Sequence, residues 1–500
     1  MRPHNIWNRL RSRAGGADDS LAPASALSVT TKETPMATTA RPDQAQIEDL
    51  RSKLRGTVIT AADDGYDTAR TLYTVMIDKR PALIARCVDA ADVIAAVDFG
   101  RENGLDIAIR GGGHNVAGLS SADGGLVIDL SEMRGVRVDP QRRTARVSGG
   151  ALWGDVDHAT HAFGLATPSG IISTTGVGGL TLGGGFGHLA RHYGLACDNL
   201  VSADVVTADG SFLTASADEH PDLFWALRGG GGNFGVVTSF ELALHPAGTV
   251  YGGPIFYDVA HTEMLLRFFL DWLHDAPDAL SAFFSFHQGP PAPFIPEHLH
   301  FVPMVAIVVC YSGPRERGEE MIRPLREVIP PLVDLAGPIP YPALNSMFDA
   351  IYTTGLQHYW KADFVPRVTE EAIKVHAEYG PKAPSLWSTM HLYPQSGAIQ
   401  RPASDATAYV HRDVDFVHNI VAIDADPSKM PANMAWMRAY SEALKPYSAA
   451  GGYVNFMMAE EGQARVRATY RDNYDRLARV KKAYDPHNLF HVNQNILPAG

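Results

Sequence analysis

Hydrophobic and polar positions along the first half of this chain follow two periods, which predicts strands alternating with helices. The apolar run 82–88 has the length and composition of a strand, and Asp89 after it can cap a helix with an apolar stripe. A further short strand is expected at 107–109. Two strands within 204–215 are expected to flank a two-residue hairpin turn at Asp209-Gly210. The pattern predicts a mixed α/β domain.

The pattern changes after Gly248, where long strands rich in aromatic residues and histidine alternate with longer amphipathic helices. We expect helices over 262–274, 315–328 and 431–444, and strands over 251–257, 282–287, 305–311, 386–393 and 416–423. This composition predicts an antiparallel sheet backed by helices. One long charged helix is expected over 461–484, ended by Asp485-Pro486.

These changes divide the chain into four parts: 1–42, 43–248, 249–451 and 452–500. The first part is rich in Ala, Ser, Thr and Pro without periodicity, so we expect a disordered tail. Asp18 and Asp19 stand where a signal peptide would need its apolar region, so export is not expected. Met36 is an alternative start of the chain.

Composition narrows the classes of function. The chain has 500 residues, of which 45% are hydrophobic and 20% charged, which is typical of a globular protein with two or three domains. Its net charge of −12 argues against a nucleic-acid-binding surface. No apolar run approaches the ~18 residues of a membrane span. Three widely spaced cysteines fit a reducing, cytoplasmic compartment.

Glycine clusters carry the clearest chemical signal. Gly111 to Gly113 follow an expected strand directly, and 176–187 holds seven glycines in twelve residues. Glycine costs conformational entropy on folding, so such clusters indicate a large ligand lying against the backbone. A third cluster, 229–235, contains a formal G-x-G-x-x-G. A helix precedes it and a strand follows, so we reject it as a dinucleotide-binding motif, which needs a strand before the turn and a helix after it.

Four motifs together resemble the berberine-bridge-enzyme-like FAD-linked oxidases of the vanillyl-alcohol-oxidase/PCMH superfamily. They are RGGGHN-V-x-G after a strand, P-S-G-x(5)-GVGGLTLGGGFG, R-x-Y-G-L-x-x-D-N, and the C-terminal YDP-x-N-L-F-x-x-N-Q-N-I. The resemblance covers 80–245 and 453–496, and the middle of the chain more loosely. It implies an α+β fold: a PCMH-type FAD-binding domain of two α/β subdomains at 43–248, an inserted substrate domain at 249–451, and a C-terminal segment at 452–500 that completes the FAD domain.

The resemblance also implies an activity and a set of cofactor-binding residues. The expected protein is an FAD-dependent oxidase that takes hydride from a small-molecule alcohol, sugar or amine, with O₂ as electron acceptor. In the family, the histidine of the first motif, here His114, is bonded covalently to the 8α-methyl group of the flavin. The residues expected to bind FAD are Arg110, Gly111, Gly112, Gly113, His114, Asn115, Gly118, Gly170, Gly176, Gly179, Gly183, Gly187, Val237, Asn455, Asn493 and Gln494.

Many members of the family attach the flavin a second time, through a cysteine just before the second glycine cluster. Ile172 occupies that position here, so a single covalent link is expected. Cys197 lies beyond the cluster and is interpreted as a structural thiol, whereas Cys87 and Cys310 sit in apolar strands and are expected in the core.

The segment 453–456 (YVNF) resembles the family's Y-x-N-Y segment, which carries a catalytic tyrosine in several members. Only Tyr453 keeps a hydroxyl group here, because Phe456 replaces the second tyrosine. Its ordinary pKa near ~10 is too high for a base at neutral pH unless a hydrogen bond or a positive charge stabilises the phenolate. The alternative is that Tyr453 only packs against the flavin or hydrogen-bonds it.

Other residues leave alternatives open. Six polar-aromatic residues can line a substrate cavity or pack in the core: His358, Tyr359, Trp360, Lys361, Trp387 and His391. The pairs His188/His192 and His298/His300 lack a third ligand, so no metal is expected. Two competing functions remain: a nicotinamide-dependent reductase and a flavoprotein that binds a small molecule without turnover. The family oxidises sugars, alkaloids, hydroxynicotine-like amines and polyketides, and the sequence does not choose among these.

Overall fold

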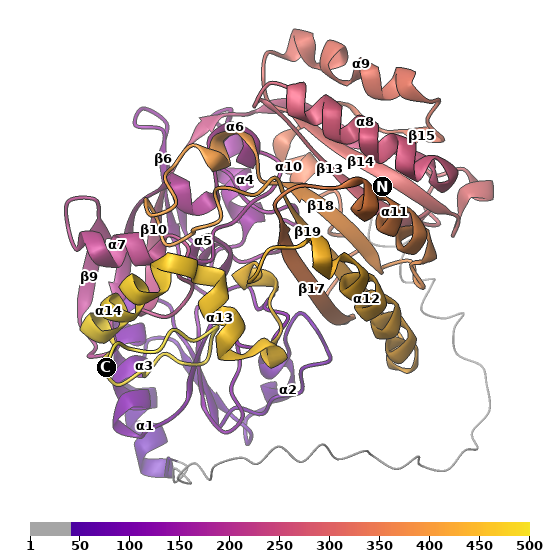
Figure 1. Ribbon diagram of the computed structural model, residues 1–500. Coiled ribbons are helices and arrows are strands. Elements are labelled where there is room, and N and C mark those ends of the chain that lie inside the picture. The colour runs from indigo at the N-terminus through magenta and orange to yellow at the C-terminus, as the bar shows by residue number, and fades with distance from the viewer. Residues whose placement is uncertain (1–41) are drawn as a thin grey trace, which may run out of the picture. The chain divides into compact units, whose positions relative to one another are not determined.

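The computed structural model describes residues 42–500, which carry four β-sheets and the helices that cover them (Figure 1). The tail predicted to be disordered lies outside the described residues except for its last position. The α-helices of the described part are α1 (Gln44–Lys53), α2 (Tyr66–Arg70), α3 (Ala90–Glu102), α4 (Trp153–His161), α5 (Val177–Leu182), α6 (Ala190–Tyr193), α7 (Pro221–Leu227), α8 (Thr262–Asp275), α9 (Gly318–Val328), α10 (Tyr341–Asn345), α11 (Glu370–Tyr379), α12 (Met430–Leu444), α13 (Gly462–Tyr470) and α14 (Tyr474–Tyr484).

The first sheet has the order β1-β2-β4-β3, formed by β1 (Thr57–Thr60), β2 (Leu83–Arg86), β4 (Leu126–Asp129) and β3 (Ile107–Arg110). Strand β4 runs parallel to both of its neighbours. The Asp89 side chain accepts the backbone N–H of Asp92 and caps α3, as expected. Apolar residues of α1 and α3 pack against this sheet in one buried cluster, so the predicted strand–helix–strand start of the domain is confirmed.

The second sheet is antiparallel, with the order β5 (Val136–Asp139), β6 (Thr144–Ser148), β10 (Val236–Ala243), β8 (Leu200–Val206) and β9 (Phe212–Ser216). The expected hairpin is β8–β9, but the prediction of a two-residue turn is wrong. The strand pairing ends at Val206 and Phe212. In the connection between the two strands, the Asp209 carboxylate accepts hydrogen bonds from the Thr207 hydroxyl and the Ser211 N–H.

The largest sheet is antiparallel and belongs to the middle of the chain. Its order is β15 (Val333–Asp334), β12 (Thr249–Asp258), β14 (Pro303–Tyr311), β13 (Leu280–Gln288), β18 (Thr389–Pro394), β19 (Phe416–Asp424) and β17 (Gln357–Val365), with β16 (Gly337–Pro340) also paired to β12. A short fourth sheet joins β7 (Leu165–Ala166) to β11 (His245–Pro246).

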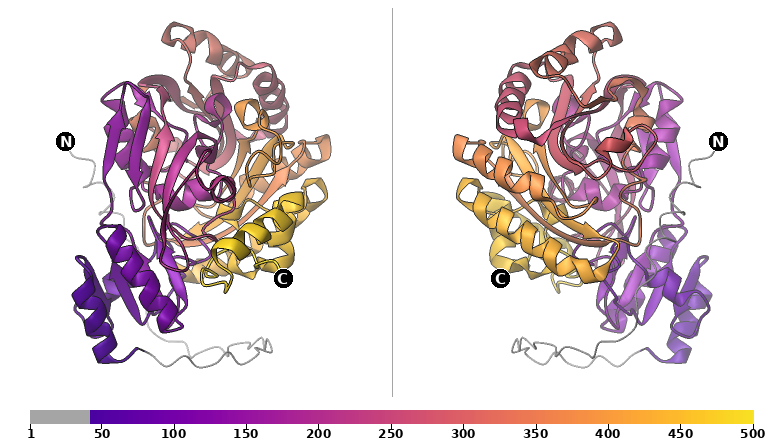
Figure 2. Two further views of the ribbon diagram at one scale, coloured as in Figure 1. Left: turned by 90° about the vertical axis from the view of Figure 1, so that its left-hand side faces the viewer. Right: turned by 90° about the vertical axis from the view of Figure 1, so that its right-hand side faces the viewer.

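The two faces of the largest sheet have different neighbours. Helices α8, α9, α11 and α12 cover one face, where the largest hydrophobic cluster lies (Figure 2). The other face contributes Phe283, Tyr393 and Val421 to a second cluster, which contains Phe186 of the glycine-rich segment. The predicted α+β architecture, with an antiparallel sheet backed by helices, is therefore confirmed. The face of this sheet that the helices leave free packs against the glycine-rich half of the chain.

Three elements of the second half differ from the prediction. Strand β17 was not predicted, because as an edge strand it carries polar residues such as Lys361 and Asp363 among its apolar ones. Helix α11, capped by Thr369, was also missed. The single helix expected over 461–484 is wrong: the chain breaks at Arg471, where φ is +43°, and α14 follows after a short 3₁₀ turn.

No helix within residues 42–500 combines the length and the apolar character needed to cross a membrane.

Candidate active site

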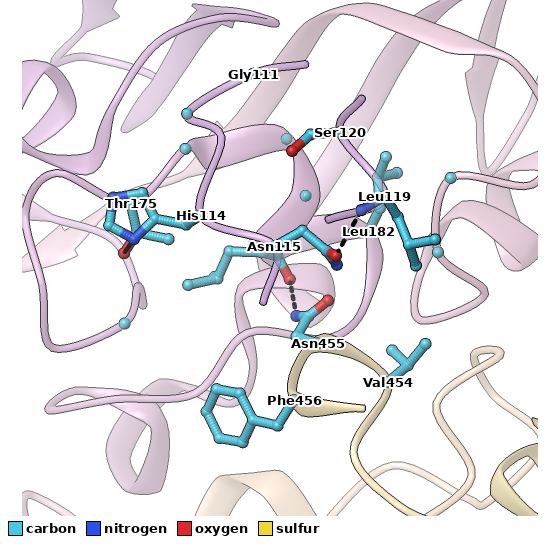
Figure 3. A pocket seen from close by; sticks show the side chains of 18 of the residues that line it. Gly111, His114, Asn115, Leu119, Ser120, Thr175, Leu182, Val454, Asn455 and Phe456 are labelled. Atoms are coloured by element: carbon cyan, nitrogen blue, oxygen red, sulfur yellow. Dashed lines mark hydrogen bonds between the residues drawn. The ribbon is translucent and has the colours of Figure 1, made fainter. Parts of the chain in front are cut away.

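A cavity of about 320 Å³ lies between the glycine-rich segments and the strands β17, β18 and β19 (Figure 3). Tyr453 and twelve of the sixteen residues expected to bind the cofactor line it. The twelve are Gly111, Gly112, Gly113, His114, Asn115, Gly170, Gly176, Gly179, Val237, Asn455, Asn493 and Gln494. Segments more than 300 positions apart in the sequence thus share one cavity.

The other four expected residues lie outside the lining and have structural roles. The buried Arg110 donates to the backbone carbonyls of Ala69 and Ser120. A Cβ atom on Gly118 would stand 2.7 Å from Ile77, one on Gly183 would stand 2.1 Å from Asn455, and one on Gly187 would stand 2.3 Å from the Gly170 carbonyl. These three glycines serve close packing of the chain on itself, which the motif alone does not distinguish from ligand contact.

Bare backbone forms much of the remaining cavity wall. Gly112 and Gly176 touch, since a Cβ on either would lie 2.4 Å from the backbone nitrogen of the other. A Cβ on Gly179 or Gly232 would instead meet open space. The wall at these two positions therefore lacks side chains although there is room for them.

The third glycine cluster also contributes to the cavity, which its sequence pattern did not predict. Gly231, Gly232, Asn233 and Gly235 line it. The rejection as a dinucleotide motif is consistent with the structure, because α7 precedes the cluster and β10 follows it. The cluster forms a turn between a helix and a strand, and this turn is part of the cavity wall. A motif that requires a strand, a turn and a helix in that order does not recognise such a turn.

His114 is held between an aromatic ring and two hydroxyl groups. Its imidazole stacks on Tyr73, with ring centroids 3.9 Å apart and planes 16° from parallel. The Thr174 hydroxyl lies 3.2 Å from Nε2 and the Thr175 hydroxyl 3.5 Å from Nδ1. Burial lowers the pKa of His114 to about 4, so the ring is neutral at pH 7 and keeps a lone pair on one nitrogen. A neutral, fixed imidazole is the form that covalent attachment requires.

The three cysteines lie away from the cavity. Ile172, at the position of a second attachment, lines it, whereas Cys197 is fully buried with its Sγ 3.8 Å from Asp198. Cys87 and Cys310 are buried free thiols. Burial raises the pKa of each of the three thiols, which disfavours the reactive thiolate.

Tyr453 lies at the boundary between the glycine wall and the sheet. Its hydroxyl oxygen accepts the Gly185 N–H at 2.8 Å and the Asn455 amide at 2.9 Å. The ring packs between Phe186 and Phe456, with centroids 4.6 and 4.8 Å away. Burial raises the pKa of Tyr453 above its ordinary value, while the two donated hydrogen bonds oppose that rise.

Side chains of β17 alternate between the cavity and the helical face. His358 and Trp360 line the cavity, whereas the Tyr359 hydroxyl and Lys361 contact Glu460 outside it. His391 on β18 also lines the cavity, and Trp387 before β18 does not. Three of the six polar-aromatic residues proposed to line a substrate cavity thus face this cavity. Within residues 42–500 no three His, Cys, Asp or Glu side chains are placed to hold a metal ion.

Several buried polar atoms of the lining have no partner within the described chain. On the glycine side these include Ser120 Oγ and Asn493 Oδ1. An unpaired buried polar atom costs about 1–3 kcal/mol, so such atoms indicate a ligand that supplies the missing partners. The open glycine backbone, these unpaired atoms and the neutral His114 together fit the extended, polar and aromatic FAD molecule.

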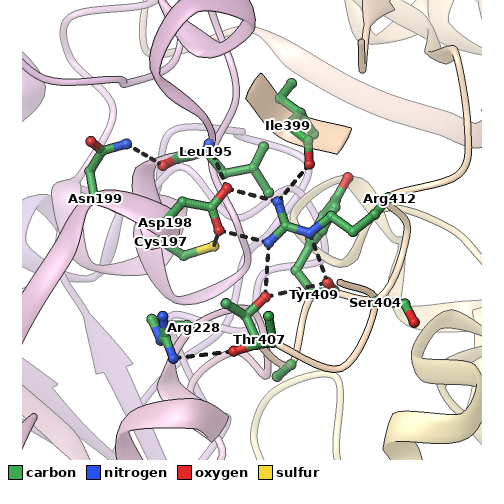
Figure 4. A network of polar contacts seen from close by, with 12 residues as sticks. Leu195, Cys197, Asp198, Asn199, Arg228, Ile399, Ser404, Thr407, Tyr409 and Arg412 are labelled. Carbon is green, nitrogen blue, oxygen red and sulfur yellow. Dashed lines mark hydrogen bonds and ion pairs between the residues drawn. The ribbon is translucent and has the colours of Figure 1, made fainter. Parts of the chain in front are cut away.

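A buried ion pair ties the 3₁₀ turn Ala196–Asn199, which follows the glycine-rich segment, to the loop before β19 (Figure 4). Arg412 donates to both carboxylate oxygens of Asp198 at 2.7 Å. Its guanidinium also donates to the Ile399 carbonyl at 3.0 Å and to the Thr407 hydroxyl at 2.9 Å. The side chains of Arg412 and Asp198 are 4% and 12% exposed, so the pair is bidentate and nearly dry.

Replacing Arg412 by methionine is expected to destabilise the protein by about 3–5 kcal/mol, because Asp198 stays buried without its counter-ion. The shift in the denaturant-unfolding midpoint measures this. The matched control is Arg267→Met, which breaks an exposed pair with Glu370 and is expected to cost at most about 1 kcal/mol. Equal shifts for the two variants would contradict a structural role for the buried pair.

Comparisons with known proteins agree with this site. Residues 81–216 match the family described as "FAD binding domain", and residues 452–497 match "Berberine and berberine like". The chain is 32% identical to (R)-6-hydroxynicotine oxidase of Paenarthrobacter nicotinovorans, over 89% of this chain and 98% of that protein. It is 30% identical to a FAD-linked oxidoreductase of Bacillus subtilis (strain 168), over 90% of this chain and 98% of the other.

Solved structures show the same relationship. The crystal structure of 6-hydroxy-D-nicotine oxidase from Arthrobacter nicotinovorans superposes with a TM-score of 0.80 at 30% identity, covering 89% of this chain and 98% of that one. Xylooligosaccharide oxidase from Myceliophthora thermophila reaches a TM-score of 0.78 at 25% identity, with 91% and 100% covered.

The fold and the cavity therefore define an FAD-dependent oxidoreductase. The chain belongs to the berberine-bridge-enzyme-like FAD-linked oxidases of the PCMH superfamily, as the four motifs indicated.

Proposed function

We propose that this protein oxidises a small-molecule alcohol, sugar or amine with FAD bound covalently through His114, and that O₂ is the electron acceptor. When bound, FAD supplies the hydride-accepting chemistry that side chains lack. The observation that carries the proposal is one continuous cavity, which joins the bare glycine wall and His114 to the polar strands β17–β19. A cofactor on the glycine side would meet a substrate on the sheet side.

The protein's own residues have distinct tasks in this proposal. The glycine backbone binds the cofactor at close range, and His114 anchors it. Tyr453 is proposed as the group that takes the substrate's hydroxyl or amine proton, supported by its place in the lining and by two hydrogen bonds that favour the phenolate oxygen. The aromatic and histidine side chains of β17 and β18 position the substrate.

Anaerobic mixing with a panel of alcohols, sugars and cyclic amines tests this function. A substrate should bleach the flavin absorbance, and admitting O₂ should restore it with release of one H₂O₂ per flavin. Bleaching by NADH or NADPH would favour the nicotinamide-dependent alternative. Ligands that shift the flavin spectrum but never bleach it would favour binding without turnover.

A single attachment point is expected, because Ile172 stands at the second position and Cys197 is buried away from the cavity. Mass spectrometry of a proteolytic digest should find the flavin mass on the peptide that contains His114 and on no cysteine peptide. A peptide pair joined through both a histidine and a cysteine would contradict this prediction.

A further inference from the structure

The cavity lining carries no permanently charged side chain. Among the lining residues that the structure describes, none is Asp, Glu, Lys or Arg. Its three histidines are His114, His358 and His391, and burial lowers the pKa of each well below neutrality. A ligand on the sheet side therefore meets a neutral surface at pH 7.

Two charged groups close in the chain to lining residues are bonded elsewhere. Lys361 lies on the other face of β17 and pairs with Glu460 and Glu461 at 3.2 and 3.1 Å. Asp349 accepts the Ser173 backbone N–H at 2.9 Å and also the Ser173 hydroxyl. Neither side chain lines the cavity, so neither is placed to neutralise a charged ligand there.

The sheet side instead presents buried polar atoms that lack partners. Both ring nitrogens of His358, Nε1 of Trp360, Nδ1 of His391 and Oδ1 of Asn419 make no hydrogen bond within the described chain. Each lies on a strand that lines the cavity. Because a native core rarely leaves such atoms unpaired, they indicate a ligand with its own hydrogen-bonding groups.

Two of these residues stand side by side. His391 on β18 and Asn419 on β19 are paired directly across the strands. Side chains at such paired positions have Cβ atoms about 4.5–5.5 Å apart, so one substituent of a ligand can reach both. The neutral imidazole carries one N–H and one lone pair, and the Asn419 side chain carries an accepting oxygen and a donating NH₂ group. A hydroxyl group can therefore donate to one of the two residues while it accepts from the other.

Aromatic rings line the same cavity as this polar pair. Tyr393 stacks on His391 with ring centroids 5.3 Å apart and planes 23° from parallel. Phe456 meets Trp360 edge to face at 5.3 Å, and Phe186 lies 5.4 Å from Tyr393. All four aromatic residues line the cavity, so the walls favour a flat apolar body.

We propose, on the basis of the oxidase function above, that the substrate is an electrically neutral, ring-bearing alcohol or phenol whose hydroxyl group is bound by His391 and Asn419. A protonated amine or a carboxylate would be desolvated among these residues without a counter-ion, which is costly. The alcohols, sugars and amines of the proposed function are thereby narrowed to neutral compounds that carry a ring and a hydroxyl group.

Three probes that share the naphthalene ring system and differ in charge test the preference for a neutral ligand: 2-naphthalenemethanol, 2-naphthylmethylamine and 2-naphthoate. Each is mixed with the anaerobic holoenzyme at pH 7, where the second is a cation and the third an anion. The rapid shift of the flavin spectrum and parallel calorimetry give the dissociation constant. Any slower bleaching gives the reduction rate separately. The alcohol is expected to bind at least about tenfold more tightly than either ion.

Asn419→Leu tests the assigned residue. Loss of one hydrogen bond, about 1–2 kcal/mol, should weaken binding of the alcohol about 5- to 30-fold. Binding of 2-methylnaphthalene, which lacks the hydroxyl group, should stay within about twofold and thereby report an intact cavity. The control Asn103→Leu alters a half-buried asparagine at the C-terminal end of α3, outside the cavity lining, and should leave both constants unchanged.

The outcomes separate this inference from the oxidase function. Binding of the amine or the acid as tightly as the alcohol, or binding of none of the three, would overturn the inference. An Asn419→Leu protein that loses alcohol and hydrocarbon affinity equally would overturn the assignment to Asn419. Selective binding of the alcohol with no bleaching by it or by any compound of the wider panel would support the neutral site and count against the oxidase.

Discussion

Alanine at position 114 is expected to convert a protein whose yellow colour survives acid precipitation into one that loses all its flavin to the supernatant. The reason is that His114 is the lining histidine that follows the glycines of the first cluster, held by Tyr73 and two threonine hydroxyls as a nucleophile for the covalent link. Absorbance of the acid pellet and supernatant, together with ultraviolet fluorescence of the band on a denaturing gel, measures the attached fraction.

The native fold should persist in this variant, because the ring makes no buried ion pair and its loss leaves the glycine wall unchanged. His192→Ala is the matched control. It removes a half-buried histidine that bonds Ser312 and does not line the cavity, so its flavin should stay in the pellet. A pellet that stays yellow in His114→Ala would show that another residue forms the link.

The glycine-rich side of the cavity could be predicted from the sequence because its signals are local. A loop such as 111–115 follows its strand directly, and a glycine such as Gly179 leaves the backbone bare beside open space. Gly183 and Gly187 lie outside the cavity lining. Their missing Cβ atoms make room for Asn455 and for the Gly170 carbonyl, which are contacts made by distant parts of the chain.

The sheet side of the cavity could be predicted only as a set of candidates with an open alternative, because strand pairing creates it. His391 and Asn419 meet only when β18 and β19 lie side by side, and His358 joins them through β17, a strand with too mixed a pattern to be recognised. Successive side chains of β17 point to opposite faces of the sheet. Which face lines the cavity and which is covered by helices becomes clear only when the positions of the helices are known. The break at Arg471 is likewise tertiary, since Asn473 after it donates to carbonyls of the loop before β19.

Replacing Tyr453 by phenylalanine is expected to slow flavin reduction by substrate about 10²–10⁴-fold, or about 3–5 kcal/mol of activation free energy, if Tyr453 is the proton acceptor. Cofactor attachment should be unchanged, because His114 and the glycine wall lie on other segments. Anaerobic stopped-flow bleaching measures the rate. The control Tyr409→Phe removes a neighbouring buried phenol that bonds Gln395 outside the main cavity, and it should reduce its flavin at close to the parent rate.

The pH dependence identifies the acceptor if Tyr453 is not the base. A phenolate base acts only when deprotonated, so the rate should rise with pH, and burial moves that rise above the ordinary tyrosine range because it raises the pKa of Tyr453. His391 is the alternative acceptor. Burial lowers its pKa, so it would stay an unprotonated base at neutral pH and lose activity only in acid. Tyr359 is excluded from this role, since its hydroxyl contacts Glu460 outside the cavity.

Loss of the alkaline rise of the reduction rate in Tyr453→Phe would identify Tyr453 as the group that accepts the substrate proton. A Tyr453→Phe protein with the parent rate, together with slow reduction in His391→Asn, would move the assignment to His391.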